Sequence, residues 1–252
     1  MVAEIMVLGS GTRVLLREHS MSGYAVSRQD FFLLLDCGGG AIRRALEAEL
    51  PILHVDAILF SHLHLDHVAD LPALLWALDG EGRQRAERPL RLFGPPGFGN
   101  FFAGLSALYG KWLERLPVPV LIHEVELERF TLGPWQIETL PMFHGTPANG
   151  YRLKAEGKIL AYTGDTGPCD EVVTLARDAD WLISECSFPD GHKMPMHLTA
   201  GEVGQLAARA NCRRILLTHF YPECFGVDIA AQCRNFFSGE IELASDLKRL
   251  ML

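Results

Sequence analysis

The hydrophobic positions of this 252-residue chain fall mainly into short continuous runs bounded by glycine, aspartate or proline. Apolar runs of this length are typical of strands that are buried on both faces. We therefore predict strands over residues 5–8, 31–35, 57–60, 90–93, 159–162, 181–183 and 215–217.

Between several of these runs, the apolar residues change to the three- and four-residue spacing of a helix. This pattern predicts helices over residues 41–49, 71–78, 171–177 and 200–210. Thr199 and Glu202 stand in the positions of a capping box at the start of the last of these helices. Alternating strands and helices indicate a layered α/β fold, and the length favours one domain spanning residues 1–252.

The stretch 98–116 carries the strongest helical pattern, with nine apolar residues at three- and four-residue steps. It predicts one amphipathic helix packed on the core. A wall of a substrate cleft and the subunit interface of a homodimer are the alternative interpretations.

Composition narrows the class of protein. The net charge of −8 argues against a protein that binds nucleic acid through a broad basic surface, although a local contact with nucleic acid remains an alternative. The charged stretch 79–91 is expected to be a solvated loop, with a substrate-phosphate contact from Arg83, Arg85, Arg88 or Arg91 as the alternative.

The cysteines, the apolar runs and the N-terminal residues indicate the cellular compartment of the protein. Six cysteines without a CxxC pair predict reduced thiols. No run approaches the roughly 20 apolar residues of a membrane-spanning helix, and residues 1–12 lack the pattern of a signal peptide. We expect a soluble, cytoplasmic protein with no membrane partner.

The chemistry of the chain is concentrated directly after the predicted strand 57–60. His62, His64, Asp66 and His67 lie within six residues there, where a strand gives way to a loop. Burying so many polar side chains separately would require a hydrogen-bond partner for each. Because one metal ion satisfies them together, the cluster predicts a metal site.

A second ion is indicated by further candidate ligands at the ends of later apolar runs. These are His144, Asp165 and His219. A catalytic metal takes about four ligands and leaves a position open for water, so this number of ligands favours two divalent ions. Imidazole and carboxylate suit zinc, while manganese and iron stay open as alternatives.

The order of these motifs resembles the metallo-β-lactamase superfamily. The matching segments are HLHLDH at 62–67, His144, YTGDT at 162–166 and Thr218-His219, and the resemblance extends from LGSG at 8–11 to Tyr221. Within the superfamily, the chain is most similar to the ribonuclease Z and phosphodiesterase branch, through LDCG at 35–38, FGPPG at 93–97, GYR at 150–152, and SECS at 184–187 with HLT at 197–199.

This resemblance implies an αββα sandwich, in which two mixed sheets are flanked by helices and the metals lie at one edge. The positions that match the family's ligands are His62, His64 and His144 for the first ion, Asp66, His67 and His219 for the second, and Asp165 as the bridge. Asp36 matches a residue that orients a ligand histidine, with a turn-forming or helix-capping aspartate as the alternative.

The resemblance also implies the reaction, a hydrolysis by a metal-bridging hydroxide. Asp66 would accept a proton from the attacking water, and the pair Glu185 and His197 would protonate the leaving group of a phosphodiester. In the alternative interpretation, the two residues have only structural roles: Glu185 pairs with a surface cation, and His197 precedes a helix.

The sequence constrains the identity of the substrate less than it constrains the metal site. About twenty residues separate His144 from Asp165, where tRNA-processing ribonuclease Z enzymes carry a long arm that clamps tRNA. The short interval and the negative charge favour a small or cyclic phosphodiester. A tRNA 3′-end endonuclease, a lactonase, thioesterase or sulfatase on the same centre, and a non-enzymatic metal-binding protein remain the alternatives.

Overall fold

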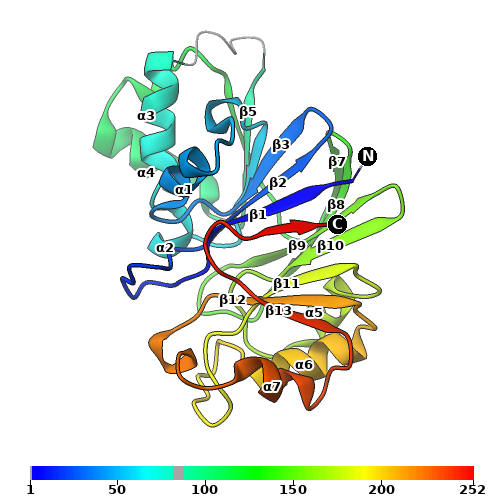
Figure 1. Cartoon of the computed structure of the whole chain (residues 1–252). Coiled ribbons are helices and arrows are strands. Elements are labelled where there is room, and N and C mark those ends of the chain that lie inside the picture. The colour runs from blue at the N-terminus through cyan, green and yellow to red at the C-terminus, as the bar shows by residue number, and fades with distance from the viewer. Residues whose placement is uncertain (1, 82–87) are drawn as a thin grey trace.

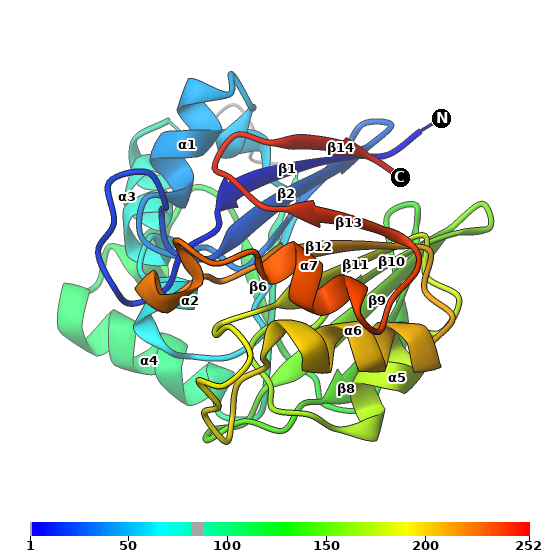
Figure 2. The ribbon, with the colours of Figure 1, turned by 60° about the horizontal axis from the view of Figure 1, so that its bottom comes forward.

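The computed structural model describes residues 2–81 and 88–252, and these form two seven-stranded sheets packed face to face (Figure 1). Helices cover the outer side of each sheet (Figure 2). The sandwich of two mixed sheets that the resemblance implied is therefore confirmed.

The first sheet has the strand order β14-β1-β2-β3-β4-β5-β6. Pairing is antiparallel from β14 to β3 and parallel from β3 to β6. The strands are β1 (Glu4–Gly9), β2 (Gly23–Arg28), β3 (Phe31–Leu35), β4 (Ala57–Leu59), β5 (Leu90–Gly94), β6 (Val120–Glu124) and β14 (Arg249–Met251).

The second sheet has the order β13-β12-β11-β10-β9-β8-β7. Its strands are parallel from β13 to β10 and antiparallel from β10 to β7. They are β7 (Arg129–Leu132), β8 (Trp135–Pro141), β9 (Asn149–Ala155), β10 (Lys158–Tyr162), β11 (Trp181–Glu185), β12 (Arg214–Thr218) and β13 (Glu240–Leu243).

The helices divide between the two sheets (Figures 1 and 2). The first sheet carries α1 (Ala41–Glu47), α2 (Leu65–Val68), α3 (Leu71–Glu81) and α4 (Phe98–Tyr109), and the second carries α5 (Asp170–Leu175), α6 (Ala200–Arg209) and α7 (Ile229–Arg234). Short 3-10 turns cover Ile52–His54, Leu113–Arg115 and Pro222–Cys224. The capping box of α6 is confirmed: Thr199 and Glu202 each accept a hydrogen bond from the other's backbone.

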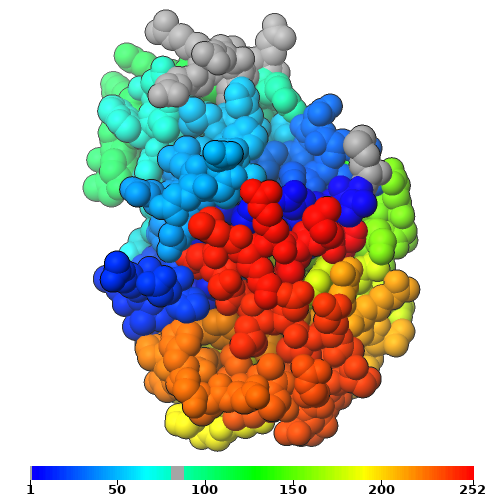
Figure 3. All heavy atoms as spheres, viewed as in Figure 1, coloured from blue at the N-terminus to red at the C-terminus, as the bar shows by residue number. Residues whose placement is uncertain are grey.

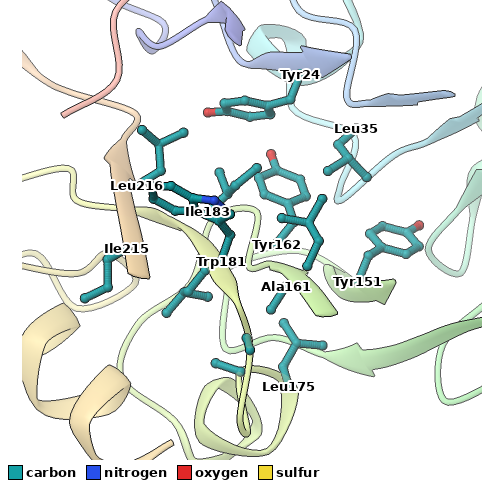
Figure 4. Packing of buried hydrophobic residues seen from close by; sticks show 14 of the residues in the cluster. Tyr24, Leu35, Tyr151, Ala161, Tyr162, Leu175, Trp181, Ile183, Ile215 and Leu216 are labelled. Atoms are coloured by element: carbon teal, nitrogen blue, oxygen red, sulfur yellow. The ribbon is translucent and has the colours of Figure 1, made fainter. Parts of the chain in front are cut away.

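Alternating side chains of the first sheet enter two different cores. Ile5 and Val7 belong to the core that lies between the sheets, whereas Met6 and Leu8 belong to the core under α1 and α3. The core between the sheets also holds Tyr24, Tyr151 and Tyr162, whose hydroxyl groups all find partners (Figure 4). These tyrosines bring hydrogen-bonding groups into the apolar layer beside the strand ends.

Two expectations need correction. The stretch 98–116 is not one helix, because α4 ends at Tyr109, the φ of 92° and ψ of −174° of the next residue, Gly110, are not helical, and a separate 3-10 turn follows. The loop expected from Asp79 begins later, since α3 continues to Glu81.

The substrate-phosphate contact suggested as the alternative for the arginines of the same stretch stays a prediction. Arg91 lies in β5, and Arg88 pairs with Asp56 at 3.0 Å. Neither residue lines the cleft described below. Arg83 and Arg85 lie outside the described residues.

All six cysteine thiols are free, and five of them are buried. Within residues 2–81 and 88–252, no helix is both long and apolar enough to cross a membrane. Leu108 and Tyr109 at the end of α4 are exposed, and the subunit interface suggested for this segment stays a prediction.

Candidate metal centre

The histidine cluster directly follows the carboxyl end of β4, an inner strand of the first sheet. His62 follows the strand and is fully buried, and His64 is exposed. Asp66 and His67 lie in the short helix α2, with His67 fully buried. The chain therefore turns from strand to helix inside the motif, which points its polar side chains toward one place.

Three other elements bring the remaining candidates to the same place. His144 follows β8, Asp165 follows β10 and His219 follows β12, all in the second sheet. Their ligand atoms and those of the β4–α2 segment lie within 4.8 Å of one another in overlapping groups of three. Two of these groups are His62, His64 and His144, and Asp66, His67 and His219, the same division between two ions that the resemblance implied.

Asp165 lies between these two groups. Its Oδ1 is 3.3 Å from Nε2 of both His67 and His219, and its Oδ2 is 3.9 Å from Nε2 of His62. Gly164, with a φ of 58°, makes the turn that places this carboxylate.

Three buried atoms at the centre have no hydrogen-bond partner among the described residues: Nε2 of His67, Nε2 of His219 and Oδ1 of Asp165. A buried polar atom without a partner is costly. All three are atoms that coordinate metals, so the site fits the two divalent ions that the family's fold implies.

Asp36 explains how His67 is oriented. It follows β3 with a φ of 58°, and its buried carboxylate accepts a hydrogen bond from His67 Nδ1 at 2.6 Å. The Ser61 N–H and hydroxyl donate to the same carboxylate at 2.6 and 2.7 Å, and the Tyr162 hydroxyl also donates. With Nδ1 held in this way, Nε2 of His67 faces Asp165.

Glu185 and His197 form a second polar group beside the cluster. His197 Nδ1 lies 3.1 Å from Glu185 Oε1 and 4.0 Å from Asp165 Oδ2. The buried Glu185 carboxylate also accepts hydrogen bonds from the Thr166 N–H and from the Ser187 hydroxyl, which in turn lies 3.0 Å from His219 Nδ1. Glu185 is therefore not the partner of a surface cation.

The surroundings of the cluster shift the pKa values of its histidine and aspartate side chains, and these shifts decide which of them carry a charge. Burial lowers the pKa of His62 well below its usual value, and the neighbouring His67 adds to this effect. Burial alone would raise the pKa of Asp66, but the His219 ring, whose Nε2 lies 3.6 Å from Oδ2, and the charge of His67 lower it to about 2. Asp66 is therefore ionised at neutral pH, and the ring of His62 is neutral.

The pKa of His197 shifts in the opposite direction. Burial opposes protonation of this ring, but the hydrogen bond to Glu185 and its negative charge raise the pKa.

A cleft of about 550 Å³ opens onto these groups. Its polar lining includes His64, Asp66, His144, Asp165 and His197, and its other residues are Arg13, Leu65, Gly145, Phe188, Met194, Pro195, Met196 and Tyr221. Clefts of this size hold small organic ligands.

Several residues of the site were not predicted from the sequence. Ser61 and Tyr162 donate hydrogen bonds to Asp36, Ser187 lies within hydrogen-bond distance of His219, and Arg13 and Tyr221 line the cleft. Ser61 and Ser187 lie inside or next to the quoted motifs, so their position was a usable signal. Nothing in the local pattern around Arg13 points to the cleft.

Comparison with known proteins identifies the family. The model of the beta-lactamase superfamily domain matches residues 32–220, which hold every candidate ligand. The chain belongs to this superfamily. As a metallo-β-lactamase-fold protein with metal-hydrolase relatives, it is a metal-dependent hydrolase.

Three relatives place the chain within the superfamily. It is 34% identical over 248 residues to an uncharacterised protein of Mycobacterium tuberculosis, covering 94% of this chain and 88% of that protein. It is 30% identical over 230 residues to the probable metallo-hydrolase YhfI of Bacillus subtilis, covering 88% and 89%. It is 28% identical over 271 residues to the ribonuclease Z of Methanosarcina acetivorans, covering 85% and 86%.

The crystal structure of YhfI, described as a metallo-beta-lactamase fold protein, superposes on this chain with a TM-score of 0.88. The two chains are covered completely and are 25% identical in that superposition. The superfamily fold therefore extends beyond residues 32–220 to the whole chain.

Proposed function

We propose that this protein, as one metallo-hydrolase domain, is a phosphodiesterase that acts on a small or cyclic phosphodiester with two divalent ions, preferably zinc. His62, His64 and His144 would hold one ion, Asp66, His67 and His219 the other, and Asp165 would bridge them. Two such ions supply a water of lowered pKa and stabilise the negative charge that develops on the phosphoryl group.

The observation that carries this proposal is the Glu185–His197 pair beside Asp165. Cleavage of a phosphodiester expels an alkoxide, which a general acid must protonate. Glu185 binds His197 at Nδ1, and this leaves Nε2 of the same ring to give its proton to the leaving group in the cleft. Asp66 is ionised, so its carboxylate would accept the proton of the attacking water.

The shape of the site supports a small substrate over tRNA. The interval between His144 and Asp165 is occupied by the hairpin of β9 and β10, which turn at Glu156 and Gly157, both with positive φ. A hairpin of this size offers no arm for clamping tRNA. The cleft of about 550 Å³ suits a molecule of nucleotide size.

A tRNA 3′-end endonuclease is the second candidate, because a relative of 28% identity is named ribonuclease Z. A panel of substrates separates the two functions. We expect the zinc-loaded protein to hydrolyse bis-p-nitrophenyl phosphate and a cyclic nucleotide, and to leave lactones and a tRNA precursor intact. Turnover of lactones alone, or of the tRNA precursor alone, would overturn the proposal.

The role of His197 has its own test, because p-nitrophenolate leaves without the help of an acid and a ribose alkoxide does not. His197→Ala should lower kcat on a cyclic nucleotide by about 100-fold or more, lower it far less on bis-p-nitrophenyl phosphate, and retain the metal. His54→Ala, an exposed histidine that precedes β4, is the matched control. Loss of metal from the His197 variant, or equal losses on both substrates, would contradict the assignment.

A further inference from the structure

The loop between β1 and β2, residues 10–22, contributes one side chain to the cleft. Arg13 is the single arginine or lysine among the residues that line the described cleft. It is exposed, and it has no ion pair or hydrogen bond with any other described residue. Its guanidinium carbon lies 6.0 Å from the centre of the Tyr221 ring, which stacks on Phe188 at 4.9 Å.

The base of this loop is held firmly. The Ser10 N–H and hydroxyl donate to Asp246 Oδ1 at 3.1 and 2.9 Å, and the Ser20 N–H donates to Oδ2 at 2.7 Å. The Asp246 side chain is only 4% exposed and also pairs with Arg44 at 3.0 Å. One carboxylate from the β13–β14 connection therefore joins both ends of the loop.

The base is also joined to the metal centre. The Phe220 N–H, next to His219, donates to the Ser10 carbonyl at 3.1 Å. A Cβ at Gly9 would lie 1.7 Å from the Met21 carbonyl oxygen, so the two sides of the loop touch at backbone level. Figure 3 shows the dark-blue loop bordering the orange segment, and His19 packs against Phe225 there.

The tip of the loop differs from its base. Leu15 is 84% exposed, and the side chain of Arg17 is 96% exposed. A fixed base with an exposed tip can hold a side chain at a constant place over the cleft without filling it. A guanidinium that has no ion pair or hydrogen bond with the other described residues, beside the proposed site for phosphodiesters, has the geometry to donate hydrogen bonds to two phosphate oxygens at once.

We propose that residues 10–22 form a substrate-anchoring loop, in which Arg13 pairs with the non-bridging oxygens of the substrate's phosphate and Asp246 positions Arg13 through Ser10 and Ser20. This inference rests on the proposed phosphodiester substrate.

The first experiment measures binding, so that it does not depend on turnover. Phenyl phosphate is titrated into zinc-loaded wild type, Arg13→Ala, Arg13→Lys and the control Arg17→Ala by calorimetry, after the metal content of each has been shown to be equal. Arg13→Ala should weaken binding about tenfold. Arg13→Lys should weaken it less, because lysine keeps the charge and loses the planar fork, and Arg17→Ala should bind as wild type does.

The outcomes separate this inference from the proposed function. Equal binding by all variants, absence of binding by wild type, or equal weakening in the Arg13→Ala and Arg17→Ala variants would overturn the role of Arg13. If binding depends on Arg13 but the wild type hydrolyses no phosphodiester, the anchoring loop stands and the proposed function is wrong.

The second experiment tests Asp246 as a positioning residue. Asp246→Asn should raise KM for bis-p-nitrophenyl phosphate as Arg13→Ala does, with kcat unchanged, and should add nothing in the Arg13→Ala background. Arg44→Ala removes the other partner of Asp246 without touching the loop, so it should leave KM unchanged. Additive effects of the two loop variants, or an equal rise of KM in Arg44→Ala, would show that Asp246 is only structural.

Discussion

The Asp36 carboxylate lies fully buried between the sheets and accepts four hydrogen bonds, two from Ser61, one from His67 and one from Tyr162. It thus joins His67, a candidate metal ligand, to a tyrosine of the opposite sheet. Its left-handed backbone, with a φ of 58°, suits aspartate and asparagine better than most residues.

Asp36→Asn should therefore keep the backbone and lose the charge that holds His67 Nδ1. We expect the affinity for zinc to fall by about 10- to 100-fold, as measured by competition with a chromophoric chelator. Asp56→Asn is the control, because Asp56 is also buried but accepts a hydrogen bond from Phe32 N–H at the far end of β4. An unchanged zinc affinity in the Asp36 variant would contradict this role.

Residues of the centre differ in how far the sequence alone could predict them. The cluster from His62 to His67 is compact along the chain, so its chemistry was visible without a fold. The resemblance implied that Asp36 orients a histidine, but no local pattern could pair it with Tyr162, which arrives from the other sheet. Arg13 was missed for the same reason, since only the packed loop brings it to the cleft.

At the level of elements, the strands that were predicted are those buried on both faces, such as β3, β11 and β12. Several strands with mixed burial were missed: β8 alternates buried and exposed residues along much of its length, and β6 at the sheet edge is largely accessible. A search for continuous apolar runs cannot find them, because alternation is the signal of a half-buried strand. The break of the predicted helix 98–116 depends on Gly110, which an apolar pattern passes over.

The turn after β10 offers a prediction at this level. A Cβ at Gly164 would lie 2.4 Å from the Ser61 Cβ and 2.8 Å from its hydroxyl, and the φ of 58° adds strain. Gly157, at the other end of β10, has a φ of 79° but open space around it. Gly157→Ala should therefore lower the free energy of unfolding by about 1–2 kcal/mol, without affecting metal binding.

Gly164→Ala should lower the free energy of unfolding further and should also weaken zinc binding, because Ser61 holds Asp36 and adjoins His62. Urea denaturation and the same zinc competition would measure both effects. If the two glycine variants behave alike, the close approach of Gly164 to Ser61 has no functional consequence.

At the scale of the whole molecule, the candidate ligands come from both halves of the sandwich. His62, His64, Asp66 and His67 follow β4 of the first sheet, whereas His144, Asp165 and His219 follow strands of the second. Most of these residues follow the carboxyl ends of parallel strands, which meet at one edge of each sheet. The metal centre therefore lies across the seam between the sheets.

Metal ions bound at this seam would join the two sheets as well as serve the reaction. Without them, the buried atoms His67 Nε2, His219 Nε2 and Asp165 Oδ1 have no hydrogen-bond partner among the described residues, and each such atom costs stability. A ligand at 100 times its Kd stabilises the folded state by about 2.7 kcal/mol.

Exhaustive chelation should therefore abolish hydrolysis and lower the Tm by about 5–10 °C, as measured by calorimetry, and added zinc should restore both. Chelation should remove the whole zinc-dependent rise in Tm, whereas His64→Ala should remove only part of it. His64 is exposed, and none of the three atoms without a hydrogen bond belongs to it. If complete removal of the metal leaves the Tm unchanged, the ions do not join the sheets, and the seam is held by the apolar core alone.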